Sequence, residues 1–165
     1  MLTKRMLIVG GLAGAAGLAR IVMQRNGDAE AAESNFPVKR TAAEWRSSLT
    51  PGQYAVLRQS ATERPYSSPL NDEHRRGNFA CAGCDQELFS STTKFESGTG
   101  WPSFWAPLDN AVGTTRDTSL FVPRTAVHCA RCGGHLGHVF DDGPKPTGLR
   151  YCMNGIAMTF KPVSA

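Results

Sequence analysis

The chain has 165 residues, of which 41% are hydrophobic and 19% charged, and these proportions are ordinary for one globular domain with a hydrophobic core. Its formal net charge is +4, but residues 1–40 hold six lysines and arginines against three acids, which leaves 12 basic and 11 acidic residues in 41–165. A domain this close to neutral lacks the basic surface that nucleic-acid binding requires, so we expect no nucleic-acid partner.

Residues 1–31 have the pattern of an export signal. Lys4-Arg5 precedes an uncharged apolar run over residues 6–19, and Ala29-Glu30-Ala31 supplies a small-x-small cleavage site. The basic pair resembles a twin-arginine signal in which lysine replaces the first arginine. We therefore expect a protein exported to a bacterial periplasm.

Two alternatives remain for this segment, namely a retained N-terminal membrane anchor facing the periplasm and a mitochondrial transit peptide. The transit peptide is considered because residues 1–27 contain four basic residues and no acid. In each case residues 32–40 are expected to form a linker and 41–165 the functional domain.

Helix-start signals follow the linker. Thr41-x-x-Glu44 and Thr50-x-x-Gln53 both have capping-box spacing, and Pro51 occupies a position where proline is tolerated in the first turn. Apolar residues then recur at helical spacing, which predicts a helix over 51–61.

From Asn78 onward the pattern changes to short β segments separated by turn residues. This change predicts a mainly β fold of two packed antiparallel β-sheets, with short helices at the N-terminal end. The expected strands cover residues 79–81, 87–90, 120–122, 125–129, 138–140 and 150–158.

Five cysteines occur as two C-x-x-C pairs and one single residue. The pairs are Cys81/Cys84 and Cys129/Cys132, and their spacing is typical of a structural zinc site with four thiolate ligands. Such a site contributes folding free energy but no catalysis, because it has no open coordination position. Redox-active pairs and two structural disulfides are the alternatives.

The fifth cysteine, Cys152, shares one face of its expected strand with Arg150 and Asn154, because side chains alternate along a strand. A nearby cation favours the thiolate over the thiol and so makes the sulfur a better nucleophile. The alternative is an inert cysteine packed in the core, which is a frequent fate of an unpaired cysteine.

Two further motifs suggest a site around that thiol. His135 and His138 provide two imidazoles able to exchange protons near neutral pH, and the alternatives are a second metal site or packed polar residues. The segment 98–104 contains Trp101 and Phe104 among glycines and a proline, and we expect it to present an aromatic wall to a small apolar group. The alternative is that Trp101 is a core residue.

Together these motifs resemble the B-type methionine sulfoxide reductases over about residues 41–160. The resemblance implies two antiparallel sheets, one structural Zn²⁺ away from the active site, and reduction of the R epimer of methionine sulfoxide, mainly in proteins. The matching motifs are Thr50-Pro51-x-Gln53-Tyr54, Cys81-x-x-Cys84, Lys94-Phe95-x-Ser97-Gly98-x-Gly100-Trp101-Pro102-Ser103-Phe104, Cys129-x-x-Cys132, His135-Leu136-Gly137-His138-Val139-Phe140-Asp141-Asp142-Gly143-Pro144 and Gly148-x-Arg150-Tyr151-Cys152-x-Asn154.

The resemblance also implies roles for individual residues. Cys152 corresponds to the attacking thiolate that becomes a sulfenic acid as methionine departs. His135 and His138 correspond to residues that bind or protonate the sulfoxide oxygen, and Trp101 to the one that packs on the substrate methyl group. Arg150 and Asn154 correspond to residues that order the site and support the thiolate.

The chain departs from the family pattern at two positions. Thr99 stands where many members carry a resolving cysteine, and Ala126 where a glutamate is common. With four cysteines expected on zinc, no thiol remains to resolve the sulfenic acid, so we expect a one-cysteine enzyme reduced by an external thiol such as a thioredoxin-like protein. We also expect a monomer. A non-catalytic zinc-binding interaction module is the alternative from another class.

Overall fold

The computed structural model describes residues 36–120 and 122–163. The export signal or anchor expected over 1–31 lies outside these residues. Within them, no helix has the length and apolar character needed to cross a membrane. The folded unit begins at Phe36, inside the expected linker: the Val38 amide donates to the Arg131 carbonyl (2.9 Å), and Phe36 packs edge-on against His128.

Two short helices lead into the β structure, as their capping signals predict. Helix α2 (Ala42–Ser48) and helix α3 (Pro51–Gln59) each begin with a complete capping box. In α2 the Thr41 amide donates to the Glu44 carboxylate at 2.7 Å, and in α3 the Thr50 amide donates to the Gln53 side chain at 3.0 Å. Local hydrogen bonds therefore suffice to fix both starts.

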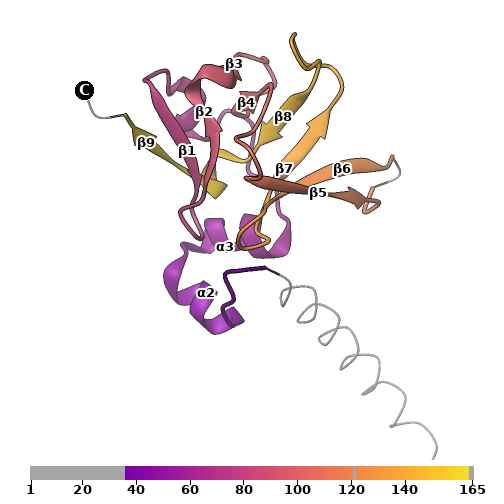
Figure 1. The fold of residues 1–165 in the computed structure, drawn as a ribbon. Coiled ribbons are helices and arrows are strands. Elements are labelled where there is room, and N and C mark those ends of the chain that lie inside the picture. The colour runs from indigo at the N-terminus through magenta and orange to yellow at the C-terminus, as the bar shows by residue number, and fades with distance from the viewer. Residues whose placement is uncertain (1–35, 121, 164–165) are drawn as a thin grey trace, which may run out of the picture. The chain divides into compact units, whose positions relative to one another are not determined.

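The rest of the domain forms two antiparallel sheets (Figure 1). The first has the order β2-β1-β9, so the C-terminal strand pairs with the first strand of the fold. The second has the order β3-β4-β8-β7-β6-β5. Strand bounds are β1 Gly77–Cys81, β2 Glu87–Ser90, β3 Lys94–Phe95, β4 Ser103–Phe104, β5 Val112–Asp117, β6 Arg124–Cys129, β7 His135–Phe140, β8 Arg150–Met153 and β9 Met158–Pro162; short 3₁₀ turns η1, η2 and η3 cover Pro69–Asp72, Ser91–Thr93 and Gly155–Ala157.

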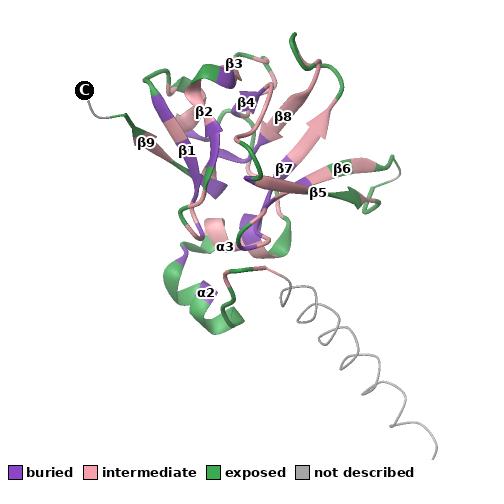
Figure 2. Cartoon of the chain, in the orientation of Figure 1, coloured by how far each residue is buried: buried purple, intermediate pink, exposed green. Residues whose placement is uncertain are grey.

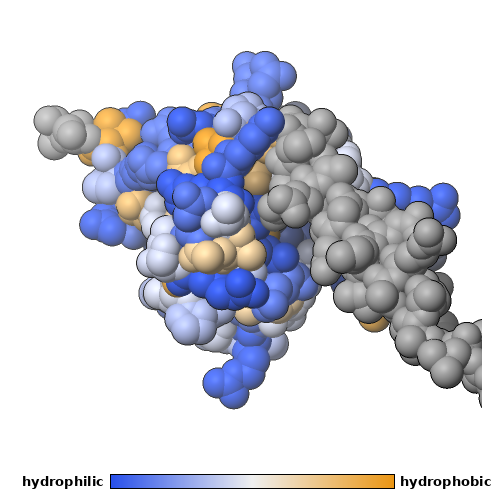
Figure 3. Space-filling view, turned by 90° about the horizontal axis from the view of Figure 1, so that it is seen from below, coloured by the Kyte–Doolittle hydropathy of each residue, from blue (hydrophilic) through white to orange (hydrophobic). Residues whose placement is uncertain are grey.

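The expected two-sheet, mainly β architecture is confirmed. Buried residues run along the facing parts of both sheets and the inner sides of the helices (Figure 2). The core includes Trp45 and Leu57 from the helices, Phe79 and Phe89 from the first sheet, and Leu136 from the second. The face that includes helices α2 and α3 is mainly hydrophilic with small separate hydrophobic areas, where the described residues are visible (Figure 3).

Two strand predictions were wrong. Residues 120 and 122 lie in the bend between β5 and β6 and are exposed, whereas the polar segment Val112–Asp117 forms the edge strand β5. The single strand expected over 150–158 is two strands, β8 and β9, which belong to different sheets and are separated by η3.

Candidate functional site

The four paired cysteines converge at the ends of β1 and β6. The ligand sulfurs all lie within 4.8 Å of one another, with Cys81 Sγ 3.7 Å from Cys132 Sγ and Cys84 Sγ 3.5 Å from Cys129 Sγ. These distances are far longer than a disulfide bond, and all four thiols are free. Four sulfurs at about 2.3 Å from a tetrahedral metal lie about 3.8 Å apart, so the cluster fits a closed Cys₄ metal site.

The remaining thiol, that of Cys152, lies on strand β8 of the six-stranded sheet. Strand β8 is flanked by β4 and β7, and Cys152 is directly opposite Ser103 on one side and His138 on the other. Residues that are directly opposite in an antiparallel pair project from the same face of the sheet. The sheet register therefore places the thiol between a hydroxyl and an imidazole.

The two histidines share that face because of an irregularity in strand β7. Simple alternation would send residues three apart to opposite faces. However, Val127 pairs with Gly137 while His128 pairs with His135, so β7 contains one extra residue at this point. This β-bulge turns His135 toward His138, and the ring centroids are 5.4 Å apart.

His138 is held by a carboxylate that sequence reasoning missed. Its Nε2 atom lies 2.7 Å from Asp117 Oδ2 on strand β5, and the same oxygen accepts from Arg124 at 2.7 Å. The Ser119 hydroxyl and amide, followed by His138 and Arg124, hold the pKa of Asp117 well below its usual range. Asp117 is therefore ionised near neutral pH, and it presents a negative charge to the imidazole. Ala126 is directly opposite His138 and has no group that could do so.

His135 has a different environment. Its side chain is only 9% exposed, and its Nε2 atom has no hydrogen-bond partner among the described residues. Burial, followed by the neighbouring His138, lowers the pKa of His135 to about 4. The ring is therefore neutral near pH 7, and its Nε2 atom has unused hydrogen-bonding capacity.

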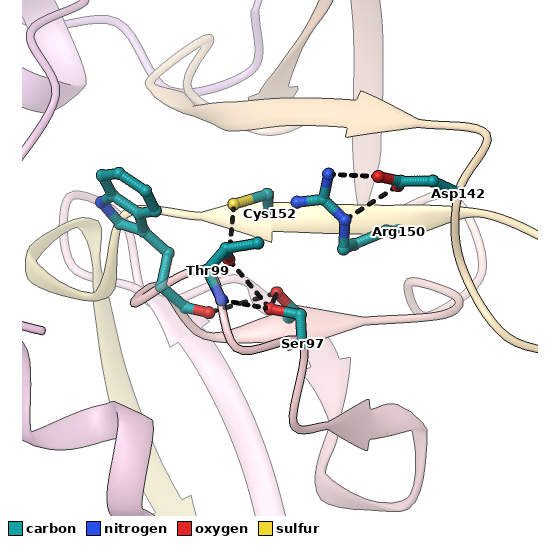
Figure 4. Close-up of polar contacts among 7 residues, drawn as sticks. Ser97, Thr99, Asp142, Arg150 and Cys152 are labelled. Atoms are coloured by element: carbon teal, nitrogen blue, oxygen red, sulfur yellow. Dashed lines mark hydrogen bonds and ion pairs between the residues drawn. The ribbon is translucent and has the colours of Figure 1, made fainter. Parts of the chain in front are cut away.

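Arg150 lies on the Cys152 face of β8, between that thiol and Asp142 (Figure 4). Its Nε and a terminal nitrogen each donate to an Asp142 carboxylate oxygen at 2.8 Å, and its guanidinium stacks on Phe140 at 4.5 Å. The Asp142 hydrogen bonds, and also the Cys152 sulfur, raise the pKa of Arg150. The salt bridge thus fixes a permanent cation beside the thiol.

Three hydroxyl groups lie close to the thiol, and two of them, those of Thr99 and Ser97, are labelled in Figure 4. Thr99 Oγ1 is 3.8 Å from Cys152 Sγ, Ser97 Oγ is 2.8 Å from Thr99 Oγ1, and Ser103 Oγ is 2.7 Å from Ser97 Oγ. The Ser103 hydroxyl also donates to the Trp101 carbonyl at 3.1 Å. Sequence reasoning identified Thr99 only by the cysteine that it lacks.

Asn154 and Trp101 are held by the same residue, Glu63. The Asn154 amide group donates to the Leu136 carbonyl at 3.0 Å and accepts from the Glu63 backbone at 2.9 Å. The Trp101 indole N–H donates to the Glu63 carbonyl at 3.2 Å. Asn154 is buried and caps η3 rather than continuing strand β8, so its contacts link strand ends instead of reaching the sulfur.

Phe104 lies in the core rather than at the site surface. Its side chain is fully buried, stacks on Phe89 at a centroid distance of 4.4 Å, and meets Phe79 edge-on at 4.9 Å. In this arrangement its ring offers no surface to a substrate, because alternation along β4 turns Ser103 toward the thiol and Phe104 away from it.

Comparisons with known proteins agree on one family. The SelR domain model matches residues 49–162. "Peptide methionine sulfoxide reductase MsrB" of Pseudomonas putida (strain W619) is 55% identical over 126 residues, which cover 76% of this chain and 95% of that protein. The proteins of the same name from Agrobacterium fabrum and Methanosarcina barkeri are 52% and 55% identical, over 76% and 75% of this chain and 94% and 88% of their own lengths.

Proposed function

We propose that this chain reduces the R epimer of methionine sulfoxide by a thiol mechanism. The chain belongs to the SelR-domain family of MsrB peptide methionine sulfoxide reductases and is an enzyme of that class. The observation that carries the proposal is the position of Cys152, between His138 and Thr99 and beside the Arg150 cation. The substrate is methionine (R)-sulfoxide, chiefly in oxidised proteins, and the biological role is their repair.

In the first step the Cys152 thiolate attacks the sulfoxide sulfur while a proton is delivered to the oxygen. The oxygen ends on Cys152 as a sulfenic acid, and the substrate leaves as methionine. Cysteine sulfur is thereby oxidised by two electrons, and the substrate sulfur is reduced by two. The protein supplies the nucleophile, the proton and the donors that hold the oxygen.

The two histidines are assigned different roles at the sulfoxide oxygen. His138, whose Nε2 atom lies 2.7 Å from the Asp117 carboxylate, is assigned the delivery of the proton to the oxygen. His135 is neutral near pH 7, so its unpartnered Nε2 contributes a hydrogen bond to the oxygen rather than a charge. Two imidazoles on one strand thus receive different roles from their surroundings.

Epimer selection follows from the shape of the substrate. A sulfoxide is pyramidal, so a site that binds the methyl group on one side and the oxygen on another fits one epimer only. We assign the methyl contact to Trp101, whose indole is anchored to the Glu63 carbonyl, and the oxygen contacts to His135 and His138.

The Cys₄ cluster is proposed to hold one structural Zn²⁺ that joins the β1–β2 hairpin to the β6–β7 hairpin. The metal, when bound, supplies folding free energy. Completion of the coordination shell by Cys81, Cys84, Cys129 and Cys132 leaves no position for substrate.

Turnover requires a thiol from another molecule. The chain has five cysteines, and four of them form the metal cluster. An external thiol, such as that of a thioredoxin-like protein, attacks the sulfenic acid to give a mixed disulfide and water, and a second thiol releases Cys152. We further propose that residues 1–31 direct export to the periplasm, that 41–165 form the catalytic domain, and that the enzyme is monomeric.

A chemical trap tests the mechanism. Wild type is mixed with a peptide containing the R or the S sulfoxide and then with a dimedone-type reagent, and labelling is read by mass spectrometry of the Cys152 peptide. We expect labelling with the R epimer only, and a Cys152→Ser variant that folds and binds zinc but produces no methionine. Methionine production by that variant would exclude Cys152 as the nucleophile, whereas a folded wild type with neither labelling nor activity would favour a zinc-binding interaction module.

Export is tested separately. N-terminal sequencing of the protein recovered from a periplasmic fraction should give a start near Ala32. Recovery of the uncleaved chain with the membrane fraction would support an anchor instead.

A further inference from the structure

The hydroxyl groups near Cys152 form a chain of four links that ends on a backbone carbonyl. The links join Cys152 to Thr99, Thr99 to Ser97, Ser97 to Ser103, and Ser103 to the carbonyl of Trp101, with lengths of 3.8, 2.8, 2.7 and 3.1 Å. The Thr99 amide also donates to Ser97 Oγ at 3.4 Å. Every link needs one hydrogen, and each hydroxyl has only one to give.

When Cys152 is a thiol, the count of hydrogens matches the count of links. The thiol donates to Thr99, Thr99 to Ser97, Ser97 to Ser103, and Ser103 to the Trp101 carbonyl. The Ser103 bond to that carbonyl, present in the structure, belongs to this arrangement. Three hydroxyl hydrogens and one thiol hydrogen satisfy all four links.

When Cys152 is a thiolate, only three hydrogens remain for four links. A hydrogen bond to a charged acceptor is worth more than one to a neutral carbonyl, so the link to sulfur is kept. Thr99 must then donate to the sulfur, Ser97 to Thr99, and Ser103 to Ser97. The link that is lost is the distant one, between Ser103 and the Trp101 carbonyl.

We propose that Thr99 is a catalytic residue whose hydroxyl donates to the Cys152 thiolate, and that Ser97 and Ser103 are positioning residues that orient it. Deprotonation of the thiol reverses all three hydroxyls and releases the carbonyl of Trp101. Thr99 thus stabilises the nucleophilic thiolate directly. Its hydroxyl, unlike a cysteine thiol at the same position, cannot resolve the sulfenic acid. The consequence for catalysis rests on the proposed function, but the effect on the thiolate does not.

Other charged and titratable groups surround the same sulfur and must be held constant in a test. Arg150, with Asp142, acts from its own strand, and His138, with Asp117 and the adjacent His135, acts from strand β7. The test variants therefore change hydroxyl groups only.

The experiment measures the alkylation rate of Cys152 by iodoacetamide as a function of pH, read by mass spectrometry of its peptide. Thr99→Val, which keeps the shape of the side chain, should move the midpoint of the profile upward by about one pH unit, the scale of one hydrogen bond to a charged group. Ser97→Ala should move it in the same direction by less, and Thr99→Ser should restore the wild-type midpoint.

The matched control is Thr92→Val. It removes a 2.8 Å hydrogen bond between the hydroxyls of Thr92 and Ser90, which are not among the linked hydroxyls near Cys152, and it should leave the midpoint unchanged. Circular dichroism and zinc content establish that each variant is folded. A Thr99→Val midpoint equal to that of wild type, or an equal shift in the control, would overturn the proposal. Because alkylation involves no sulfoxide, failure of this test is distinguishable from failure of the proposed reductase activity.

Discussion

Glu63, in the segment after helix α3, is hydrogen-bonded to residues just before β4 and just after β8, the two strands that carry the site. Its carboxylate accepts hydrogen bonds from the amides of Gly155 and Ile156. Its own amide donates to Asn154, and its carbonyl accepts from the Trp101 indole. Replacing this side chain removes the hydrogen bonds that end strand β8 and begin η3.

The expected loss can be worked from these contacts. Glu63→Ala removes two backbone-to-carboxylate hydrogen bonds, each worth roughly 1.5–3 kcal/mol when the acceptor is charged. Burial raises the pKa of Glu63 in spite of both bonds, so desolvation of the charge offsets much of that gain. We expect a net loss of about 2 kcal/mol, which lowers the Tm of a domain this size by about 6–8 °C.

Glu63→Gln should cost about half as much or less, since it keeps one oxygen to accept from the amides and carries no charge. The pH dependence follows from the raised pKa. The folded carboxyl holds its proton more tightly than the unfolded one, whose value is near 4.5. The contribution of this group to stability is therefore full below that pH and declines as the pH rises through the folded pKa, so the Tm advantage of wild type over Gln should shrink from acid to neutral pH.

The assay is thermal unfolding followed by circular dichroism at fixed zinc concentration, with sulfoxide reduction measured in parallel. Glu87→Ala is the matched control, because that carboxylate is exposed and makes one side-chain bond, to Asn78. An Ala variant as stable as wild type, or a Gln variant whose Tm deficit grows with pH, would refute the reasoning.

Other outcomes are expected at the site and at the metal cluster. Asp117→Asn should lower kcat by about 10- to 100-fold, because the loss of a charge-assisted bond to His138 is worth roughly 1.5–3 kcal/mol, and an unchanged kcat would exclude a role in proton delivery. Chelation of the metal or Cys129→Ser should lower Tm sharply and together with zinc content, whereas a stable metal-free protein would contradict a structural role. Thr99→Cys, which places a second sulfur near the 3.8 Å position of Oγ1, should convert the oxidised enzyme to an internal disulfide with Cys152, detectable as the loss of two free thiols after one turnover. Persistence of a dimedone-reactive sulfenic acid in that variant would count against the geometry.

The parts of the fold that sequence predicted best are those fixed by local chemistry. Both capping boxes depend on residues three apart, and the helix starts agree with them. The cysteine pairs likewise specify two tight turns before any tertiary contact is known. The four sulfurs of the two turns lie within 4.8 Å of one another, which is the arrangement that a single four-ligand metal site requires.

The error at β5 has a physical cause. Val112–Asp117 lies at the sheet edge, and most of its side chains are exposed or half-buried, so no hydrophobic alternation marks it. Its strand character comes from backbone pairing with β6 over six residues. The apolar residues 120 and 122 lie in the bend that follows β5, and their hydrophobic character led to the incorrect prediction of a strand there. Asp117 was missed along with the strand that carries it.

The break between β8 and β9 depends on contacts distant in sequence. Gly155 packs so closely on Ser68 that a Cβ atom there would lie 2.0 Å from the Ser68 hydroxyl oxygen. The Glu63 carboxylate accepts hydrogen bonds from the amides of residues 155 and 156. Neither partner is recognisable from the run 150–158 itself, which reads as one continuous strand.

The departure at Ala126 becomes intelligible from the sheet register. Cys152, His138 and Ala126 are successive cross-strand neighbours on β8, β7 and β6, so the position opposite His138 offers only a methyl group. Asp117, on β5, pairs with Arg124 on β6 and projects from the same face. Its carboxylate reaches the imidazole past the short alanine and is itself fixed by Arg124. The acid that backs His138 is therefore supplied from one strand further along the sheet, and the length of the side chain at position 126 decides whether that reach is open.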